Sequence, residues 1–220
     1  MLKPLLLSEL GERASLLRVD HLKVEPLPPL SFTVADGECL VVEGPSGAGK
    51  TRLLRAIADL DAATGLVFID GVERAEVRAP KWRKLVRYAS AEPGWWTDTP
   101  RDAFDLSAPS ANERLPRLLS SLGLDVKILD KPLAELSTGE RQRLALVRAI
   151  IDEPRVLLLD EPAAALDPQS VALVEELIKF QLLAGRSVVL ASHDQNQIER
   201  LAHVRLHLAK SMVPPRGKSK

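Results

Sequence analysis

The stretch "CLVVEGPSGAGKT" at residues 39–51 decides the fold, because it joins a strand pattern to a glycine-rich turn and the start of a helix. Residues 44–51 fit the pattern G-x-x-x-x-G-K-[ST], which lies between a strand and a helix in phosphate-binding loops. The glycines let backbone N–H groups close around phosphate oxygens without side-chain clashes. We therefore expect this loop to hold a nucleotide through Gly44, Pro45, Ser46, Gly47, Ala48, Gly49, Lys50 and Thr51.

Two side chains of the loop have separate expected tasks. Lys50 would place a positive charge on the β- and γ-phosphates, and the Thr51 hydroxyl would be a ligand of Mg²⁺. A glycine-rich turn that binds nothing is the alternative. The complete motif in its strand–helix context argues against that alternative.

A second apolar run, "VLLLDEP" at residues 156–162, reads as a buried strand that ends in two acids. A carboxylate at the end of a buried strand is costly unless a cation pairs with it. Asp160 is therefore expected in the Mg²⁺ shell, and Glu161 is expected to orient and polarise the water that attacks the γ-phosphate. Two acids that only cap a strand before a proline turn are the simpler alternative.

The stretch "LSTGERQRLALVRA" at residues 136–149 predicts a helix with a capping box, formed by Ser137 and Glu140. A helix start with free backbone N–H groups also favours an anion such as phosphate. The chain thus carries two candidate phosphate sites, far apart in the sequence.

With these motifs in order, residues 15–208 resemble the ATP-binding cassette ATPases, which are the nucleotide-binding subunits of ABC transporters. The resemblance implies that two cassettes meet head to tail, so that Ser137 and Gly139 of one chain bind the γ-phosphate held by the other. It also implies that Asp167 of "AALD" reaches across the dimer. His193 of "ASHD" would hold the γ-phosphate and the attacking water together with Glu161.

The sequence departs from the family pattern in the stretch where an aromatic residue usually stacks on adenine. That stretch offers Val24, Glu25 and Pro26, while Phe32 in "SFTV" is expected to face the core. Adenine would then rest on aliphatic surface, with weaker base selectivity.

A second departure concerns the glutamine that usually joins Mg²⁺ and the membrane partner to the helical lobe. The sequence has Ala91 there, followed by Glu92. Either Glu92 takes over this role or the loop ligand is lost and Glu92 is solvated. Trp95 and Trp96 follow, and we expect one of them to contact a partner, although one or both could fill the core of the lobe.

The pattern of short apolar runs and helices predicts an α/β fold: a P-loop NTPase core with a parallel sheet, an antiparallel β flank and an inserted helical lobe. The lobe is expected at about residues 94–152 within a single domain of residues 1–220, and the tail 210–220 is expected to be disordered. Strands are predicted at 16–19, 31–35, 39–44, 65–70, 85–89, 156–160, 187–192 and 204–208, and helices at 50–60, 111–122, 139–151, 168–183 and 194–202.

Composition narrows the class of protein. The 30 basic and 30 acidic residues balance, and the run at 78–87 reads as a solvated face, so we expect no nucleic-acid partner. The single cysteine, Cys39, is predicted to be a buried strand thiol in a reducing compartment. The apolar run in the first ten residues is too short for a secretory signal, and no stretch approaches the ~20 apolar residues of a membrane helix.

These features favour an ATPase subunit on the inner face of the cell membrane that binds ATP and Mg²⁺ and drives a separate transmembrane permease. In its compactness, the chain resembles the small cassettes of the metal- or heme-export type. A soluble cassette ATPase that acts on nucleic acid or ribosomes is a second possibility. A weakly hydrolysing ATP-binding module is a third, and the intact Glu161 and His193 argue against it.

Overall fold

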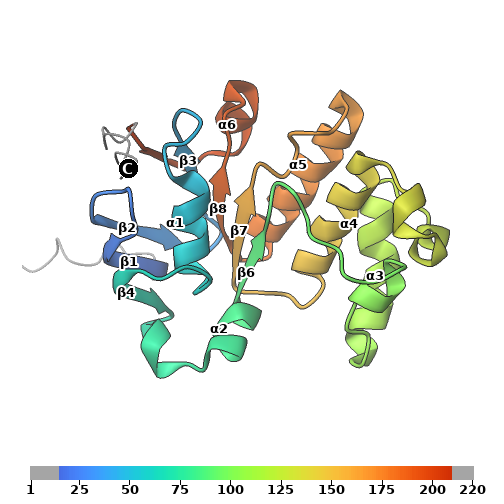
Figure 1. Cartoon of the computed structure of the whole chain (residues 1–220), viewed down its shortest axis with the longest axis horizontal. Helices are drawn as coiled ribbons and strands as arrows, with labels where there is room; N and C mark the ends of the chain where they lie inside the picture. The colour runs from blue at the N-terminus through green and yellow to red at the C-terminus, as the bar shows by residue number, and fades with distance from the viewer. Residues whose placement is uncertain (1–14, 210–220) are drawn as a thin grey trace, which may run out of the picture.

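The computed structural model describes residues 15–209 and contains two sheets with helices around them (Figure 1). The sequence expectations for the first ten residues and for the tail 210–220 lie outside the described residues. No helix in the part of the chain that the structure describes has the length and apolarity needed to span a bilayer.

The larger sheet is parallel and has the order β6-β7-β8-β3-β9. Its strands are β3 (Cys39–Glu43), β6 (Val86–Ala89), β7 (Val156–Asp160), β8 (Ser187–Ala191) and β9 (Val204–His207). The smaller sheet is antiparallel and has the order β2-β1-β4-β5. Its strands are β1 (Ser15–Lys23), β2 (Leu30–Ala35), β4 (Thr64–Ile69) and β5 (Val72–Glu73).

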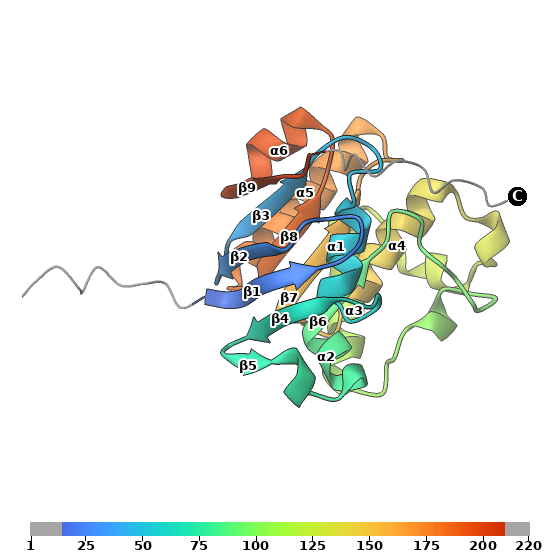
Figure 2. The ribbon, with the colours of Figure 1, turned by 60° about the vertical axis from the view of Figure 1, so that its left-hand side comes forward.

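The helices cover both faces of the parallel sheet. They are α1 (Lys50–Ile57), α2 (Ala79–Leu85), α3 (Pro109–Ser121), α4 (Thr138–Ile150), α5 (Pro168–Leu183) and α6 (Gln195–Leu201), with short 3₁₀ turns η1 (Arg74–Glu76), η2 (Arg101–Ala103), η3 (Val126–Asp130) and η4 (Leu133–Glu135). Figure 2 shows the antiparallel sheet in front of the parallel sheet, with α1 beside both. The predicted fold class and the eight predicted strands are therefore confirmed.

Alternate residues of the central strands enter two different cores. Leu40 and Leu158 pack with α1 and the antiparallel sheet, whereas Val41 and Leu157 pack with α4 and α5. Burial on both faces explains why these strands read as continuous apolar runs. Cys39 lies in the second core, so the expectation of a buried strand thiol is confirmed, and burial raises the pKa of this thiol to about 12.

The helical segments expected between residues 94 and 152 are present. This stretch holds α3, α4 and three 3₁₀ turns and contains no strand. Figure 1 shows α3 and α4 together at the side of the molecule away from the antiparallel sheet. The lobe therefore adds a second helical surface next to the parallel sheet.

The basic run at 78–87 contains a helix that the sequence analysis did not predict. In α2, Lys81, Arg83 and Lys84 are exposed, as a solvated face requires. Trp82 is fully buried between them, and its indole N–H donates to the carbonyl of Ile57 at 3.0 Å. One large apolar side chain thus holds α2 against the end of α1, while the charges around it stay in water.

Candidate functional site

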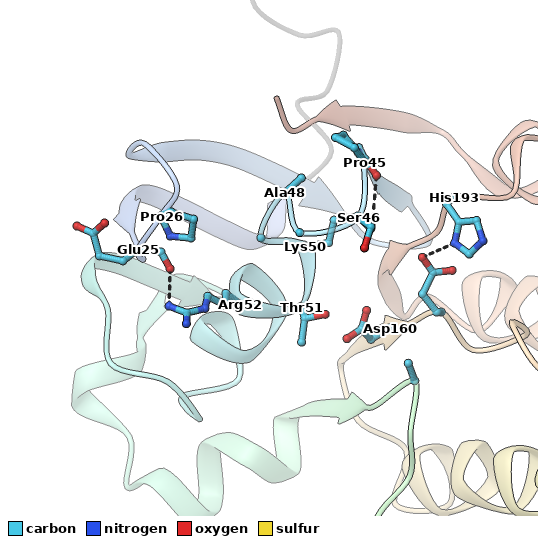
Figure 3. Close-up of a pocket in the computed structure, with 15 residues that line it drawn as sticks. Glu25, Pro26, Pro45, Ser46, Ala48, Lys50, Thr51, Arg52, Asp160 and His193 are labelled. Carbon is cyan, nitrogen blue, oxygen red and sulfur yellow. Dashed lines mark hydrogen bonds and ion pairs between the residues drawn. The ribbon is translucent and has the colours of Figure 1, made fainter. Parts of the chain in front are cut away.

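All eight residues of the predicted phosphate-binding loop line one cavity of about 1010 Å³, between the end of β3 and the start of α1 (Figure 3). Two of its glycines have positive φ and no room for a side chain. A Cβ on Gly44 would come within 2.5 Å of the Leu208 carbonyl oxygen, and a Cβ on Gly49 within 2.9 Å of the Leu27 side chain. The loop backbone can therefore take its cradle shape only with glycine at these positions.

The Lys50 and Thr51 side chains of the loop belong to residues that line the same cavity. Lys50 Nζ donates to the carbonyl of Gly44 at 2.8 Å, which folds its ammonium group back over the loop. Thr51 follows directly, in the first turn of α1, and lines the cavity with it. A positive helix start, a lysine and free backbone N–H groups together make this an anion site.

Asp160 lies at the end of β7, facing the loop, and is only 3% exposed. The Tyr88 hydroxyl donates to its Oδ2 at 3.0 Å. Burial, and then the charge of Asp160, raise the pKa of Tyr88 to about 12, so its hydroxyl remains a proton donor near neutral pH. The sequence analysis missed this contact, because it joins two strands that are distant in the sequence.

Glu161 and His193 come together as predicted. His193 Nδ1 and Glu161 Oε1 are 2.8 Å apart and form a hydrogen bond at the carboxyl ends of β7 and β8 (Figure 3). Glu161 has a φ of +48°, which is unusual for a residue with a side chain. Its N–H donates to the Ala191 carbonyl at 3.0 Å, and its carbonyl accepts from Gln142 Nε2 at 3.0 Å. These two bonds hold a strained backbone that aims the carboxylate into the cavity.

The predicted capping box at the start of α4 is present. The Glu140 N–H donates to Ser137 Oγ at 3.2 Å, and the Ser137 N–H donates to Glu140 Oε2 at 2.8 Å. This backbone hydrogen bond from Ser137 lowers the pKa of Glu140. Gly139 lies in the first turn, where a Cβ would come within 3.2 Å of Leu166. Neither Ser137 nor Gly139 lines the phosphate cavity of its own chain.

Two acids after the strands cap helices. Asp194 accepts from the N–H groups of Asn196 and Gln197 and so caps α6. Asp167 accepts from the Ser170 N–H at 3.0 Å and from its hydroxyl at 2.6 Å, and so caps α5. Its expected reach across a dimer stays a prediction.

The three residues expected to couple the cassette to a partner, Glu92, Trp95 and Trp96, lie in the loop after β6 and have different surroundings. Ala91 lines the phosphate cavity, whereas Glu92 is exposed and does not line it. Trp95 is half-buried against the core of the lobe, and Trp96 is 73% exposed. The Arg148 guanidinium lies over both rings, 4.4 Å and 4.6 Å from their centroids. One tryptophan thus supports the lobe and the other faces outward.

The residues at the cavity fit Mg²⁺ bound together with a nucleotide. No cluster of three or more His, Cys, Asp or Glu side chains suited to a metal occurs within residues 15–209. Magnesium at a nucleotide site needs only one or two protein oxygens, because phosphates and water complete its octahedron. Asp160 and Thr51 provide such a pair.

Comparison with known proteins decides the family. The profile described as ABC transporter matches residues 27–164, which is more than half of the chain and contains the loop, the α4 start and both acids. The chain belongs to the ABC transporter family. It is an ATP-binding cassette of that family.

Several curated relatives match this cassette. Protein STAR1 of Oryza sativa subsp. japonica is 36% identical over 185 residues, which cover 81% of this chain and 54% of that protein. Nod factor export ATP-binding protein I of Paraburkholderia xenovorans (strain LB400) is 36% identical, and the match covers 60% of that protein. ABC transporter I family member 17 of Arabidopsis thaliana is 35% identical, and the match covers 70% of that protein. These matches cover 79% and 81% of the cassette. The cassette thus spans 54% to 70% of the length of these relatives.

Solved structures share its fold. The structure of an ATP-binding subunit of an ABC transporter superimposes with a TM-score of 0.81 at 26% identity, covering 90% of the cassette and 87% of that chain. A dimeric ATP-binding cassette in a post-hydrolysis state, bound to ADP and Pi, has a TM-score of 0.76 at 22% identity, covering 89% and 95%.

Proposed function

We propose that the cassette hydrolyses ATP as a head-to-tail homodimer and thereby drives a separate transmembrane permease. One observation carries the dimer: the start of α4, a second candidate anion site, does not line the cavity formed by the phosphate-binding loop of the same chain. Both sites are exposed on the surface of the chain. A second copy that supplies Ser137 and Gly139 completes the cage around the γ-phosphate.

The chemistry follows from the cavity residues. Lys50 and the loop N–H groups hold the phosphates. Thr51 and Asp160 would hold Mg²⁺, which would neutralise part of the phosphate charge. Glu161 orients the water for in-line attack, while His193, hydrogen-bonded to Glu161, contacts the γ-phosphate. ATP then joins the two chains, and hydrolysis releases the γ-phosphate, which is the group that both chains bind.

Mixing two inactive variants tests the composite site. Lys50→Ala removes the positive charge that faces the phosphates, and Ser137→Glu places a negative charge where the γ-phosphate of the partner would lie. Each variant alone should lose about 100-fold or more in ATPase rate. A random mixture of the two forms heterodimers that contain one intact site. We expect the mixture to recover about a quarter of wild-type activity. A mixture as inactive as its parts would show that the site does not form across two chains.

We also propose that the outer surface beside Trp96 binds the permease, and that Glu92 takes part in coupling. The support is the 73% exposure of Trp96 next to a groove of about 320 Å³ that Tyr88 and Arg148 also line. The Tyr88 hydroxyl donates to Asp160, the proposed Mg²⁺ ligand. A single side chain, that of Tyr88, would therefore separate an occupant of this groove from Asp160. Cytoplasmic placement on the inner membrane face belongs to the same proposal.

Two substitutions test this surface. Trp96→Ala should reduce stimulation of ATPase activity by the co-expressed permease about tenfold, since buried aromatic anchors dominate interfaces, and should leave the basal rate intact. Glu92→Ala should reduce the same stimulation. Exposed Arg83→Ala is the matched control. Unchanged stimulation in both variants would exclude this surface from coupling.

A further inference from the structure

Gln142 lies in the second turn of α4, and its side chain joins this helix to Glu161. The side chain is 5% exposed, and its Nε2 donates to the Glu161 carbonyl at 3.0 Å. No donor within residues 15–209 lies within hydrogen-bond distance of its buried Oε1. A buried amide with an unpaired oxygen is less favourable for the fold than an apolar side chain of similar size. The amide therefore points to a task at Glu161 rather than to the packing of α4.

The carbonyl that accepts this bond belongs to a backbone position that needs support. Glu161 has a φ of +48°, and such a conformation persists only where its surroundings hold it. Its N–H donates to the Ala191 carbonyl in β8, and its carbonyl also accepts from the Ala164 N–H at 3.2 Å. The Ala164 bond lies within the turn itself and moves with it. The Gln142 bond instead fixes the turn to a separate element, helix α4 of the lobe.

The first turn of α4 packs against the same turn. A Cβ on Gly139 would lie 3.2 Å from the Leu166 side chain and 3.8 Å from the Ala165 carbonyl oxygen, so the helix and the turn are in close contact. Ser137, at the start of the helix, is the residue proposed to meet the γ-phosphate of the partner. A short stretch of one helix thus lies between a residue proposed to face the partner chain and a residue that holds Glu161 of its own chain.

We propose that α4 serves two nucleotides: its start, with Ser137, contacts the nucleotide of the partner chain, and Gln142 positions Glu161 at the nucleotide of its own chain. Gln142 does not line the phosphate cavity, so it is a positioning residue that acts through Glu161. This inference rests on the proposed function, because it takes Glu161 as the group that orients the water.

Replacing Gln142 with Met tests the hydrogen bond, since Met keeps the length of the side chain and lacks the donor. We expect kcat to fall about 10- to 100-fold, as expected when a reacting group is displaced by about 1 Å, and the KM for ATP to stay within about twofold. The urea midpoint should not fall, because Met also removes the unpaired oxygen and the Glu161 carbonyl keeps the Ala164 N–H. Gln142→Leu, which also lacks the donor, should behave in the same way.

The matched control is Gln181→Met, at a buried glutamine of α5 outside the site, which should keep kcat. A Gln142→Met enzyme within about twofold of the wild-type kcat, or one that loses activity only through a higher KM, would overturn the assignment.

Mixed dimers show on which chain Gln142 acts. In the mixture of Lys50→Ala and Ser137→Glu chains, the working site combines the loop and Glu161 of the Ser137→Glu chain with α4 of the Lys50→Ala chain. Gln142→Met added to the Ser137→Glu chain should lower the activity of the mixture about 10- to 100-fold. Added to the Lys50→Ala chain, it should leave that activity within about twofold.

Equal losses in the two arrangements, or a loss confined to the Lys50→Ala chain, would overturn the assignment and make Gln142 a support of the α4 start. If the starting mixture recovers no activity, the composite site of the proposed function is wrong. The kcat of the uniform Gln142→Met protein then still decides whether Gln142 positions Glu161.

Discussion

Replacing Glu161 with Gln should lower kcat by about 10²–10⁴, the usual contribution of a positioned general base, and should preserve nucleotide binding. The amide keeps the size and can keep the hydrogen bond to His193, but it lacks the charge with which Glu161 is proposed to polarise the water. The backbone at Glu161 is held by Ala191 and Gln142, so the substitution should not alter the fold. Phosphate release under saturating Mg-ATP measures the effect.

The matched variant for this experiment is Glu140→Gln, an acid of the capping box outside the cavity. It should lower the rate far less, since it alters only one cap. A Glu161→Gln enzyme within tenfold of the wild-type rate would show that another group polarises the water.

Replacing Trp82 with Ala lowers the free energy of unfolding by about 3–5 kcal/mol, as expected for removal of a fully buried aromatic side chain. The substitution opens a cavity between α1 and α2 and also removes the donor to the Ile57 carbonyl. Urea denaturation followed by circular dichroism measures the change.

Trp82→Phe helps to separate the two causes, because it keeps a buried six-membered ring and removes the smaller ring of the indole together with its N–H. We expect it to cost less than the alanine variant, and exposed Lys84→Ala to cost within about 0.5 kcal/mol. A loss below about 1 kcal/mol for Trp82→Ala would contradict the packing described for α2.

The sequence predicted those features that local pattern determines. Apolar runs gave the strands, and the glycine-rich loop and the Ser137–Glu140 spacing gave two helix starts, because each depends on neighbouring residues. Helix α2 was not predicted, because its one buried apolar residue, Trp82, lies among charged residues and the segment shows no apolar periodicity.

The missed site contacts are long-range. The Tyr88 hydroxyl, on β6, donates to Asp160 at the end of the neighbouring strand β7. The Gln142 side chain, on α4 of the lobe, donates to the Glu161 carbonyl. Neither partner carries a local signal, because both contacts exist only once β6, β7 and α4 are packed.

The composite site is tested most directly by light scattering on the Glu161→Gln protein with and without Mg-ATP. The proposed head-to-tail closure predicts the mass of one chain without nucleotide and of two chains with it. Adding Ser137→Glu should return the ATP-bound protein to the mass of one chain. A protein that stays at the mass of one chain while ATP is bound, or that dimerises equally well with Ser137→Glu, would contradict the account.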